Sequence, residues 1–401
     1  MKLDELKDKK ILILGFGREG RDTLKFLKKL FPRKKIDIAD QKFDKNYLEK
    51  TKDYDVIIKS PGIPFKSLRT TGVRKLTTQT EIFFDNCPGK IIGVTGTKGK
   101  STTASMIYAI LKAGNIRSEL IGNIGKPVLS LLAKTAPEKI FIYELSSFQL
   151  TNLKTSPHIA VLLNIYPEHL DYYRSFKEYV QAKANIAKYQ KKSDYLIYNS
   201  ENAQIKTIVE LSKAKKIPIK GQYYQLDIEA AKRVGEIFQI PPRKVELAIR
   251  NFKFLPHRLE YIGRFKGIKF YNDSLATVPE ATIGALNHLG DDIQTLILGG
   301  FDRGLNFKKL AESIAKSKVK TLILFPTTGS RILRDLRNPS LKSFSVNTMK
   351  EAVKLAYRYT DRGKICLLSP ASPSFGLFRD YADRGDQFRK FVRGMKNATI
   401  N

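Results

Sequence analysis

The stretch GVTGTKGKSTT, residues 93–103, has the residue types and the spacing of a phosphate-binding loop. A short β-branched apolar run comes before it, and apolar residues at helical spacing follow it as far as Gly114. In a strand–loop–helix unit of this kind, the backbone N–H groups of the loop and the helix N-terminus attract an anion. Lys100 would reach the outer phosphates of a nucleotide, and the Ser101 hydroxyl would ligate Mg²⁺. The usual signature has glycine where Val94 stands, so the stretch is a close variant of it.

Three further residues have types that suit such a site. Glu144 lies in FIYELSS, where both alternating faces are largely apolar, so an ionised carboxylate there needs a partner such as a metal. His169 follows an apolar strand in NIYPEHLDYY and is either structural or a ligand. Lys183, in a helical pattern, is by composition one more solvated lysine. Residue chemistry therefore indicates an Mg²⁺–nucleotide site and leaves the phosphate acceptor open.

A second glycine-rich turn lies near the N-terminus. The sequence GFGREG matches G-x-G-x-x-G through Gly15, Gly17 and Gly20. Asp40 ends the next predicted strand about twenty residues later, where an acid that binds ribose is found in dinucleotide-binding proteins. Taken alone, this turn predicts NAD.

The elements that must position these residues alternate along the whole chain of 401 residues. Residues 1–86 show short apolar strands separated by helical patterns and are predicted to form a small Rossmann-like βαβ domain. Residues 87–254 begin with a Pro-Gly linker and the phosphate loop and are predicted to form a P-loop ATPase-like α/β domain. Residues 255–401 carry further strands with helices between them and are predicted to form a second Rossmann-like α/β domain.

The composition restricts the partners and the compartment. Lys and Arg number 72 against 39 Asp and Glu, a formal net charge of +33, which favours anionic ligands such as nucleotides but equally fits RNA or a membrane surface. The lysines are spread singly, so we expect no nucleic-acid binding. The first residues lack the core of a signal peptide and no apolar run is long enough to span a membrane, which predicts a cytoplasmic protein. Cys87 and Cys366 indicate neither a disulfide framework nor a zinc site.

A series of segments in the chain resembles the Mur ligases. The resemblance runs in collinear order over nearly the whole chain through GVTGTKGKST, GNIGKP, YELSSFQL, NIYPEHLDYY, AKANI, LPHRLEYIG, YNDSLATVPEAT, LGGFDRG and LLSPASPSFGLFRDYADRGDQF. The last four segments are similar to those of the family member that adds D-glutamate. The resemblance thus implies a substrate-binding domain at 1–86, a central ATP-binding domain at 87–254 and a glutamate- and ATP-binding domain at 255–401.

The resemblance also implies the reaction. Such a ligase transfers the γ-phosphoryl group of ATP to the carboxylate of UDP-N-acetylmuramoyl-L-alanine, and the amine of D-glutamate attacks the resulting acyl phosphate. This is a step in the synthesis of the peptidoglycan precursor. Phosphorylation is needed because a carboxylate by itself would have to expel oxide. The task of the protein is then positioning and charge neutralisation.

Site residues carry over from the matching motifs, as implications of the resemblance. Lys100, His169 and Lys183 are expected to be catalytic, with Lys183 carbamylated so that it becomes an oxygen ligand. The two expected Mg²⁺ sites would use Ser101, Glu144, His169 and Lys183. The expected ATP contacts are Gly96, Thr97, Lys98, Gly99, Lys100, Ser101, Thr102, Arg258 and Asp273. The UDP-substrate would contact Gly15, Phe16, Gly17, Arg18, Asp40, Ser60, Pro61, Gly62 and Asn123. The incoming glutamate would contact Thr277, Ser374 and Tyr381.

Three other hypotheses remain open at this point. A related Mur or folylpolyglutamate-type ligase would add another amino acid. A degenerate UDP-sugar or nucleotide sensor is suggested by GQYYQLD, where Tyr223, Tyr224 and Asp227 replace the histidine and asparagines of the family motif. A dehydrogenase would explain the first glycine turn but not the phosphate loop. For the ligase we expect small-molecule substrates, no membrane insertion and a monomer.

Overall fold

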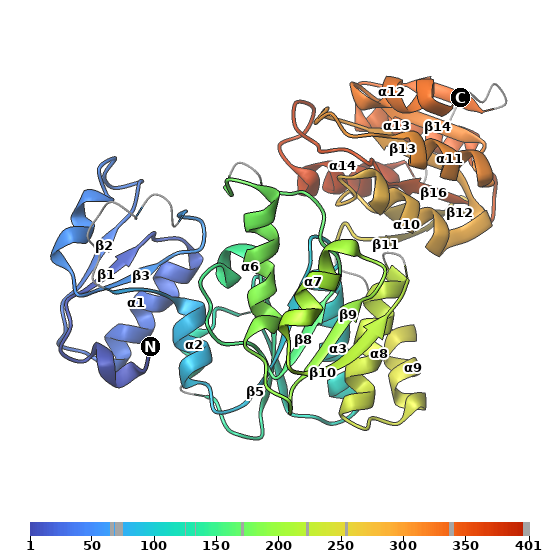
Figure 1. The fold of residues 1–401 in the computed structure, drawn as a ribbon. Helices are drawn as coiled ribbons and strands as arrows, with labels where there is room; N and C mark the ends of the chain where they lie inside the picture. The colour runs from blue at the N-terminus through green and yellow to red at the C-terminus, as the bar shows by residue number, and fades with distance from the viewer. Residues whose placement is uncertain are drawn as a thin grey trace. The chain divides into compact units, whose positions relative to one another are not determined.

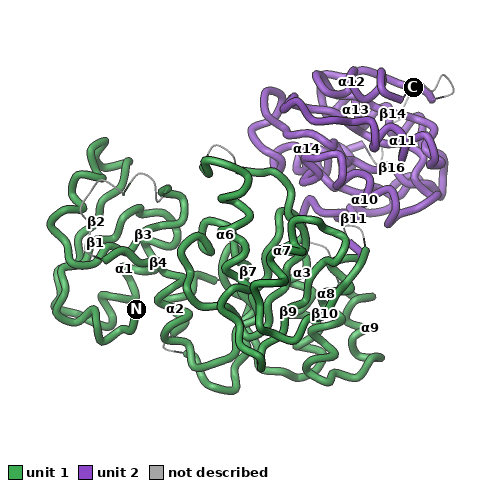
Figure 2. The backbone as a smooth tube through the Cα atoms, viewed as in Figure 1, with its two compact units in different colours: residues 1–221, 226–252 green, residues 222–225, 253–401 purple. Residues whose placement is uncertain are grey.

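The protein is described here from a computed structural model. It describes residues 1–64, 68, 75–124, 126–132, 134–169, 172–221, 224–252, 256–336 and 341–395. The chain forms two compact units, which Figure 2 shows in different colours. Unit 1 comprises residues 1–221 and 226–252, and unit 2 comprises residues 222–225 and 253–401.

Unit 1 begins with a four-stranded parallel sheet in the order β2-β1-β3-β4 (Figure 1). Its strands are β1 (Ile11–Leu14), β2 (Ile36–Ala39), β3 (Val56–Lys59) and β4 (Lys75–Thr78). Its helices are α1 (Arg18–Leu30) and α2 (Gln79–Asn86), with the 3₁₀ turns η1 (Leu3–Leu6) and η2 (Glu49–Asp53). Every residue of the apolar strand β1 is buried, as expected for a parallel strand with a neighbour on each side.

A six-stranded parallel sheet in the order β10-β9-β8-β5-β7-β6 completes unit 1. Its strands are β5 (Lys90–Thr95), β6 (Ser118–Gly122), β7 (Ile140–Glu144), β8 (Ile159–Leu162), β9 (Tyr195–Asn199) and β10 (Lys215–Ile219). The helices are α3 (Lys100–Ala113), α4 (Leu129–Leu132), α5 (Ser147–Leu150), α6 (Phe176–Lys188), α7 (Ala203–Leu211), α8 (Tyr224–Ile237) and α9 (Pro242–Arg250).

Both faces of this sheet are covered because its inner strands β7 and β8 are buried on both sides. Ile142 packs with α3, α8 and α9 on one face, whereas Phe141 and Tyr143 pack with α6 and α7 on the other. The second of these cores continues into the first sheet, since Phe83 of α2 packs edge-on against the rings of Phe141 at 5.4 Å and Tyr143 at 5.8 Å. The two sheets of unit 1 therefore share one hydrophobic core.

Unit 2 contains a six-stranded sheet in the order β11-β12-β16-β13-β14-β15. Only the β11–β12 pair is antiparallel among its described strands, β11 (Glu260–Phe265), β12 (Ile268–Asn272), β13 (Ile293–Gly299), β14 (Thr321–Phe325), β15 (Lys342–Ser345) and β16 (Ile365–Leu368). The helical elements are α10 (Pro279–Leu289), η4 (Gly290–Asp292), α11 (Lys308–Lys316), α12 (Thr328–Leu336), α13 (Met349–Tyr359) and α14 (Tyr381–Gly394).

The predicted fold class is confirmed, because strands alternate with helices along the chain and form three mainly parallel sheets. Each of the regions 1–86, 87–254 and 255–401 contains one of these sheets, but the domain limits remain predictions. None of the described helices combines the length and the apolar character needed to cross a membrane.

Candidate active site

The glycine-rich loop, residues 96–99, connects the central strand β5 to α3, as the sequence predicted. Gly99 precedes the helix with a φ of +89°, and a Cβ there would lie 2.3 Å from Oδ1 of Asp227, so this position requires glycine. Lys100 Nζ donates to the carbonyls of Gly96 and Thr97, both at 3.0 Å. The amine that would meet the outer phosphates is thus folded over the loop itself.

Asn164, which follows β8, holds this loop in place. Its Oδ1 accepts from the Lys98 N–H at 2.9 Å, its Nδ2 donates to the Lys98 carbonyl at 3.2 Å, and its carbonyl accepts from the Thr97 N–H at 2.7 Å. Thr97 Oγ1 also lies 3.0 Å from the Tyr179 hydroxyl, and Lys98 Nζ lies 2.8 Å from Oε1 of Glu168. Sequence reasoning missed Asn164, although a buried polar residue directly after an apolar strand was a usable signal.

Glu144 has the properties of a metal ligand. It ends β7 in register with Val94 of β5 and Gly122 of β6, and its side chain is 1% exposed. Oε1 accepts from Asn123 Nδ2 at 3.2 Å, whereas Oε2 is buried and has no hydrogen-bond partner among the described residues. A buried carboxylate oxygen without a donor suits a cation such as Mg²⁺.

The other predicted ligand of this first metal is also in the interior. Ser101 is 7% exposed and Thr102 is fully buried, both in the first turn of α3. Within the described ranges, no group of three or more His, Cys, Asp or Glu side chains is arranged so that it could hold a metal ion. A cation at Glu144 would therefore depend on the Ser101 hydroxyl and on substrate phosphates for further ligands.

Lys183 and His169 both lie beside Tyr179. Lys183 Nζ is 4.9 Å from the centre of the Tyr179 ring, and the His169 ring is 6.2 Å from it. Lys183 is 1% exposed and donates to the Gly96 carbonyl at 2.9 Å. Burial and the nearby charge of Lys100 hold the pKa of Lys183 well below its usual value, which favours a neutral amine. The expectation from composition alone that Lys183 is solvated is therefore wrong. The side chain of His169, in contrast, is 43% exposed.

The N-terminal glycine turn, residues 15–20, follows β1 and includes the start of α1. Gly15 has a φ of +90°, and its carbonyl accepts from Ser60 Oγ at 2.9 Å. A Cβ at Gly20 would lie 2.1 Å from the Gly15 carbonyl oxygen, so glycine is needed there for the helix to approach the turn. Nothing lies within 4 Å of a Cβ at Gly17, which leaves the backbone open to a ligand.

A cavity of about 520 Å³ opens over this turn in unit 1. The predicted UDP-substrate residues that line it are Gly15, Gly17, Arg18, Asp40, Ser60, Pro61, Gly62 and Asn123. Phe16, the remaining one, donates its N–H to Asp40 Oδ2 at 2.5 Å, and this bond together with one from the Lys42 N–H lowers the pKa of Asp40. Asn123 also donates to Glu144, so one hydrogen bond links the wall of the cavity to the predicted metal ligand.

Glu19 is a wall residue of this cavity that sequence reasoning missed. It accepts from Gln149 Nε2 at 2.8 Å, and burial raises its pKa to about 7. The bond to Gln149 links α1 to α5 at the wall of the cavity.

We predict that Gly20→Ala destabilises the protein while Gly62→Ala does not. The new methyl at residue 20 meets the Gly15 carbonyl at 2.1 Å, whereas nothing lies within 4 Å of a Cβ at Gly62. Urea unfolding should show a loss of about 1–3 kcal/mol for Gly20→Ala and a change within about 0.5 kcal/mol for Gly62→Ala. Equal free energies of unfolding for the two variants would contradict this packing account.

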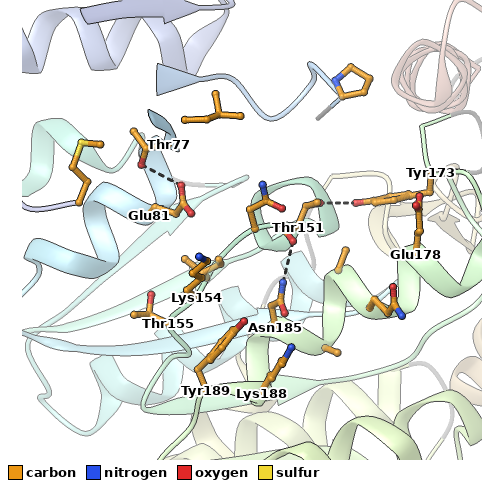
Figure 3. Close-up of a pocket in the computed structure, with 18 of the residues that line it drawn as sticks. Thr77, Glu81, Thr151, Lys154, Thr155, Tyr173, Glu178, Asn185, Lys188 and Tyr189 are labelled. Carbon is orange, nitrogen blue, oxygen red and sulfur yellow. Dashed lines mark hydrogen bonds between the residues drawn. The ribbon is translucent and has the colours of Figure 1, made fainter. Parts of the chain in front are cut away.

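A larger groove of about 1070 Å³ in unit 1 contains none of the sequence-predicted site residues (Figure 3). Thr151 lines this groove, with its Oγ1 3.3 Å from the Tyr173 hydroxyl and its carbonyl 3.1 Å from Asn185 Nδ2. Lys154, Lys188 and Glu178 also line this groove, so its charge is mixed. The predicted UDP-substrate residues thus line the smaller cavity, which has about half the volume of the groove.

In unit 2, Asp273 lies in the interior and is 2% exposed. Its Oδ1 accepts from the Tyr224 hydroxyl at 3.1 Å and from the Leu259 N–H at 3.2 Å, and its Oδ2 accepts from Ser369 Oγ at 2.9 Å. Burial raises the pKa of Asp273 to about 7. These donors occupy the carboxylate oxygens of Asp273 that were expected to contact the ribose of ATP, so the Asp273–ribose contact remains a prediction. The expected contact between ATP and Arg258, which is half-buried, also remains a prediction.

The predicted glutamate residues differ in exposure: Ser374 is buried, Thr277 is half-buried and Tyr381 is 42% exposed. Sequence reasoning missed the fully buried Arg384, which donates hydrogen bonds to residues close in sequence to Thr277 and Ser374. It donates to Oγ of Ser274 at 3.0 Å, to the Ser274 carbonyl at 2.8 Å and to the Ser372 carbonyl at 3.0 Å.

The altered segment GQYYQLD is only partly described, because Tyr223 lies outside the described residues. Tyr224 contacts Asp273, as noted above. Asp227 Oδ1 accepts from Thr103 Oγ1 of α3 at 2.8 Å and adjoins Gly99. Asp227 thus supports the phosphate loop in this chain.

Comparison with known proteins gives matches along the whole chain. Residues 94–266 match the family described as Mur ligase middle domain, and residues 257–372 match Mur ligase, glutamate ligase domain. A UDP-N-acetylmuramoylalanine--D-glutamate ligase of Acetivibrio thermocellus is 31% identical, with 98% of each chain covered. The enzyme of the same name from Clostridium kluyveri is 32% identical, with 97% of this chain and 98% of the relative covered.

Solved structures show the same fold at lower identity. A MurF ligase from Thermotoga maritima in complex with ADP matches with a TM-score of 0.62 at 17% identity, covering 98% of this chain and 96% of the other. A UDP-N-acetylmuramate-alanine ligase MurC from the same organism matches with a TM-score of 0.60 at 14% identity, covering 98% and 100%. At these identities the likeness supports the fold alone.

Proposed function

Since this chain belongs to the Mur ligase family, we propose that it is the ATP-dependent ligase that joins D-glutamate to UDP-N-acetylmuramoyl-L-alanine in peptidoglycan precursor synthesis. The substrate assignment is supported by the full-length relatives of that name at 31% and 32% identity. One structural observation carries the proposal. Asn123 lines the cavity over the N-terminal glycine turn and also donates to Glu144, the carboxylate beside the phosphate loop.

The proposed reaction begins with the UDP-substrate in the smaller cavity. The N–H groups and helix N-terminus at Gly15 and Gly17 would hold its diphosphate, Asp40 and the 60–62 segment would contact the uridine end, and Asn123 would hold the alanine end near Glu144. The substrate carboxylate oxygen attacks the γ-phosphorus of ATP, and ADP leaves. The glutamate nitrogen then attacks the carbonyl carbon, expels phosphate and loses a proton.

The residues of the phosphate loop would supply the electrostatics of the first step. Loop N–H groups and Lys100 would compensate the charge on the transferred phosphoryl group. Mg²⁺ held by Ser101 and Glu144 would neutralise further phosphate charge, and the unpartnered Glu144 Oε2 fits that role.

We propose that Lys183 is carbamylated. Its buried, neutral amine would form an N–C bond with CO₂ and lose a proton, which converts a nitrogen donor into a carboxylate-like ligand. The low pKa of Lys183 supports this, since only a neutral amine is nucleophilic. His169, whose ring also lies near Tyr179, would share the second metal with it.

The substrates and the compartment follow from this reaction. We propose that the protein acts as a monomer on small molecules in the cytoplasm, where ATP and UDP-linked precursors are found. In unit 2, Thr277, Ser374 and Tyr381 would contact D-glutamate, and Arg258 and Asp273 would contact ATP.

The proposal predicts that, in the presence of Mg²⁺, the protein releases phosphate from ATP only when UDP-N-acetylmuramoyl-L-alanine and D-glutamate are both present. A panel of D- and L-amino acids in the same assay tests the amino-acid assignment. Release with a different amino acid would instead identify a neighbouring ligase. Binding of UDP-sugars without any release would favour the sensor.

UDP, but not NAD, should raise the thermal stability of the whole chain. A ligand that binds only the folded state stabilises it by about 2.7 kcal/mol at a hundredfold excess over its Kd. The full chain is used because the first sheet shares its core with the second. Stabilisation by NAD alone would support the dehydrogenase hypothesis.

A further inference from the structure

The loop Ser60–Ile63 forms one wall of the smaller cavity, and two side chains hold its carbonyl groups. Lys59 Nζ donates to the Ser60 carbonyl at 2.8 Å and to the Ile63 carbonyl at 2.6 Å. The Tyr172 hydroxyl lies 3.1 Å from the Pro61 carbonyl and 3.1 Å from the Ile63 carbonyl. Donors from two distant parts of the chain therefore converge on one short loop.

Lys59 is an unusual residue for this task because it is 1% exposed. A buried ammonium group is unfavourable unless acceptors surround it. Here the loop carbonyls supply them, and Glu19 and Glu81 add favourable charge, while burial lowers the pKa of Lys59 to about 8. An apolar side chain would fill the same place without the desolvation cost, so the ammonium contributes contacts to the loop rather than core volume.

Tyr172 reaches the loop from the turn that carries His169. Its N–H donates to the His169 carbonyl at 3.1 Å, and its ring packs on Phe148 at 4.3 Å. The His169 ring packs on the same Phe148 at 4.8 Å. The position of the Tyr172 hydroxyl is thus set by the segment that presents the proposed metal ligand.

We propose that Lys59 and Tyr172 are positioning residues that clamp the 60–63 loop in the conformation that receives the uridine diphosphate group. This role rests on the proposed function for its ligand, but the clamp itself is a property of the loop. Two readouts therefore test it: amide hydrogen exchange of the loop, which needs no ligand, and affinity for UDP.

Tyr172→Phe is the decisive variant because it removes only the hydroxyl and keeps the ring on Phe148. Tyr173→Phe is its matched control, since the Tyr173 hydroxyl contacts Thr151 and not the loop. Lys59→Met removes the second donor at similar volume. We expect faster exchange in the peptide covering residues 56–64, and a Kd for UDP that is about three- to tenfold higher, in Tyr172→Phe and Lys59→Met but not in Tyr173→Phe.

Steady-state kinetics add a readout that a general loss of stability would not produce. In Tyr172→Phe the KM for UDP-N-acetylmuramoyl-L-alanine should rise about three- to tenfold while kcat stays within about twofold of the wild type. Unchanged loop exchange in Tyr172→Phe would overturn the clamp, whatever the activity. Faster exchange with an unchanged Kd would overturn the positioning role. Failure of the wild type itself to bind UDP would refute the proposed function instead, and loop exchange would still decide whether the clamp exists.

Discussion

Lys100→Ala should lower kcat for ATP-dependent ligation by at least about a hundredfold and leave the Kd for UDP within about twofold of the wild type. The Lys100 amine is folded over the glycine-rich loop, 3.0 Å from the carbonyls of Gly96 and Thr97. We expect it to contact the γ-phosphate of ATP there. Charge that develops on the transferred phosphoryl group loses this compensation in the variant. The smaller cavity, where we propose that UDP binds, is built from other segments and should be unaffected.

Phosphate formation in a quenched single turnover is the appropriate measurement, because it reports the chemical step without the later release of products. Lys112→Ala provides the matched control. Lys112 is an exposed lysine in the last turn of the same helix, α3, and its ammonium lies over the Tyr108 ring at 5.6 Å. Near-normal phosphate formation by Lys100→Ala, or an equal loss in Lys112→Ala, would refute the assignment of the phosphate loop.

Lys183→Ala should lose most of the ligase activity, by about a hundredfold or more, and formate or acetate should restore part of it. The amine is buried at 1% exposure and lies 2.9 Å from the carbonyl of Gly96 in the phosphate loop. If it carries a carbamate, the alanine variant leaves a gap where a small carboxylate can supply the missing oxygen. If Lys183 is only a structural amine, its removal will disturb the loop, but a carboxylate will have nothing to replace.

Rescue, rather than loss, is therefore the discriminating result. Kinetics at increasing formate should show a saturable gain in Lys183→Ala and none in the wild type. Lys188→Ala, an exposed lysine near the end of the same helix, is the control and should behave as the wild type. Mass spectrometry of the intact wild-type protein at high bicarbonate, which should show an added CO₂, gives a readout apart from activity. An inactive Lys183→Ala that no carboxylate restores would leave His169 without its proposed partner.

The phosphate loop shows which structural elements can be predicted from local sequence patterns. A β-branched run, a glycine loop and apolar residues at helical spacing predicted the strand, loop and helix that are observed as β5, residues 96–99 and α3, because backbone preference and one-sided burial depend on short stretches of sequence. The edge strand β15 was not predicted, whereas the mixed strand β2, IDIA, was. The edge strand β15 reads KSFS, and an edge strand is held by main-chain pairing that its side chains do not reveal.

The roles of polar side chains were harder to predict from the sequence, because these roles depend on residues far away in the sequence. Composition made Lys183 a solvated lysine, and only the packing of α6 against the phosphate loop buries it. Lys59 and Asn164 were not singled out, although each holds a loop of the proposed site. Asp273 was assigned to a ribose, whereas in this structure its carboxylate accepts three hydrogen bonds from the protein.

The sequence by itself determined the α/β class, the two glycine turns and the residue types that make an Mg²⁺–nucleotide ligase chemically reasonable, because these depend on local spacing and on the chemistry of each side chain. Only the tertiary structure decided which polar groups are buried, which of them meet, and that Asn123 joins the cavity over the first turn to Glu144 beside the second. The physical reason is that burial and hydrogen bonding of a side chain are set by neighbours from other strands, and strand order is a property of the folded sheet.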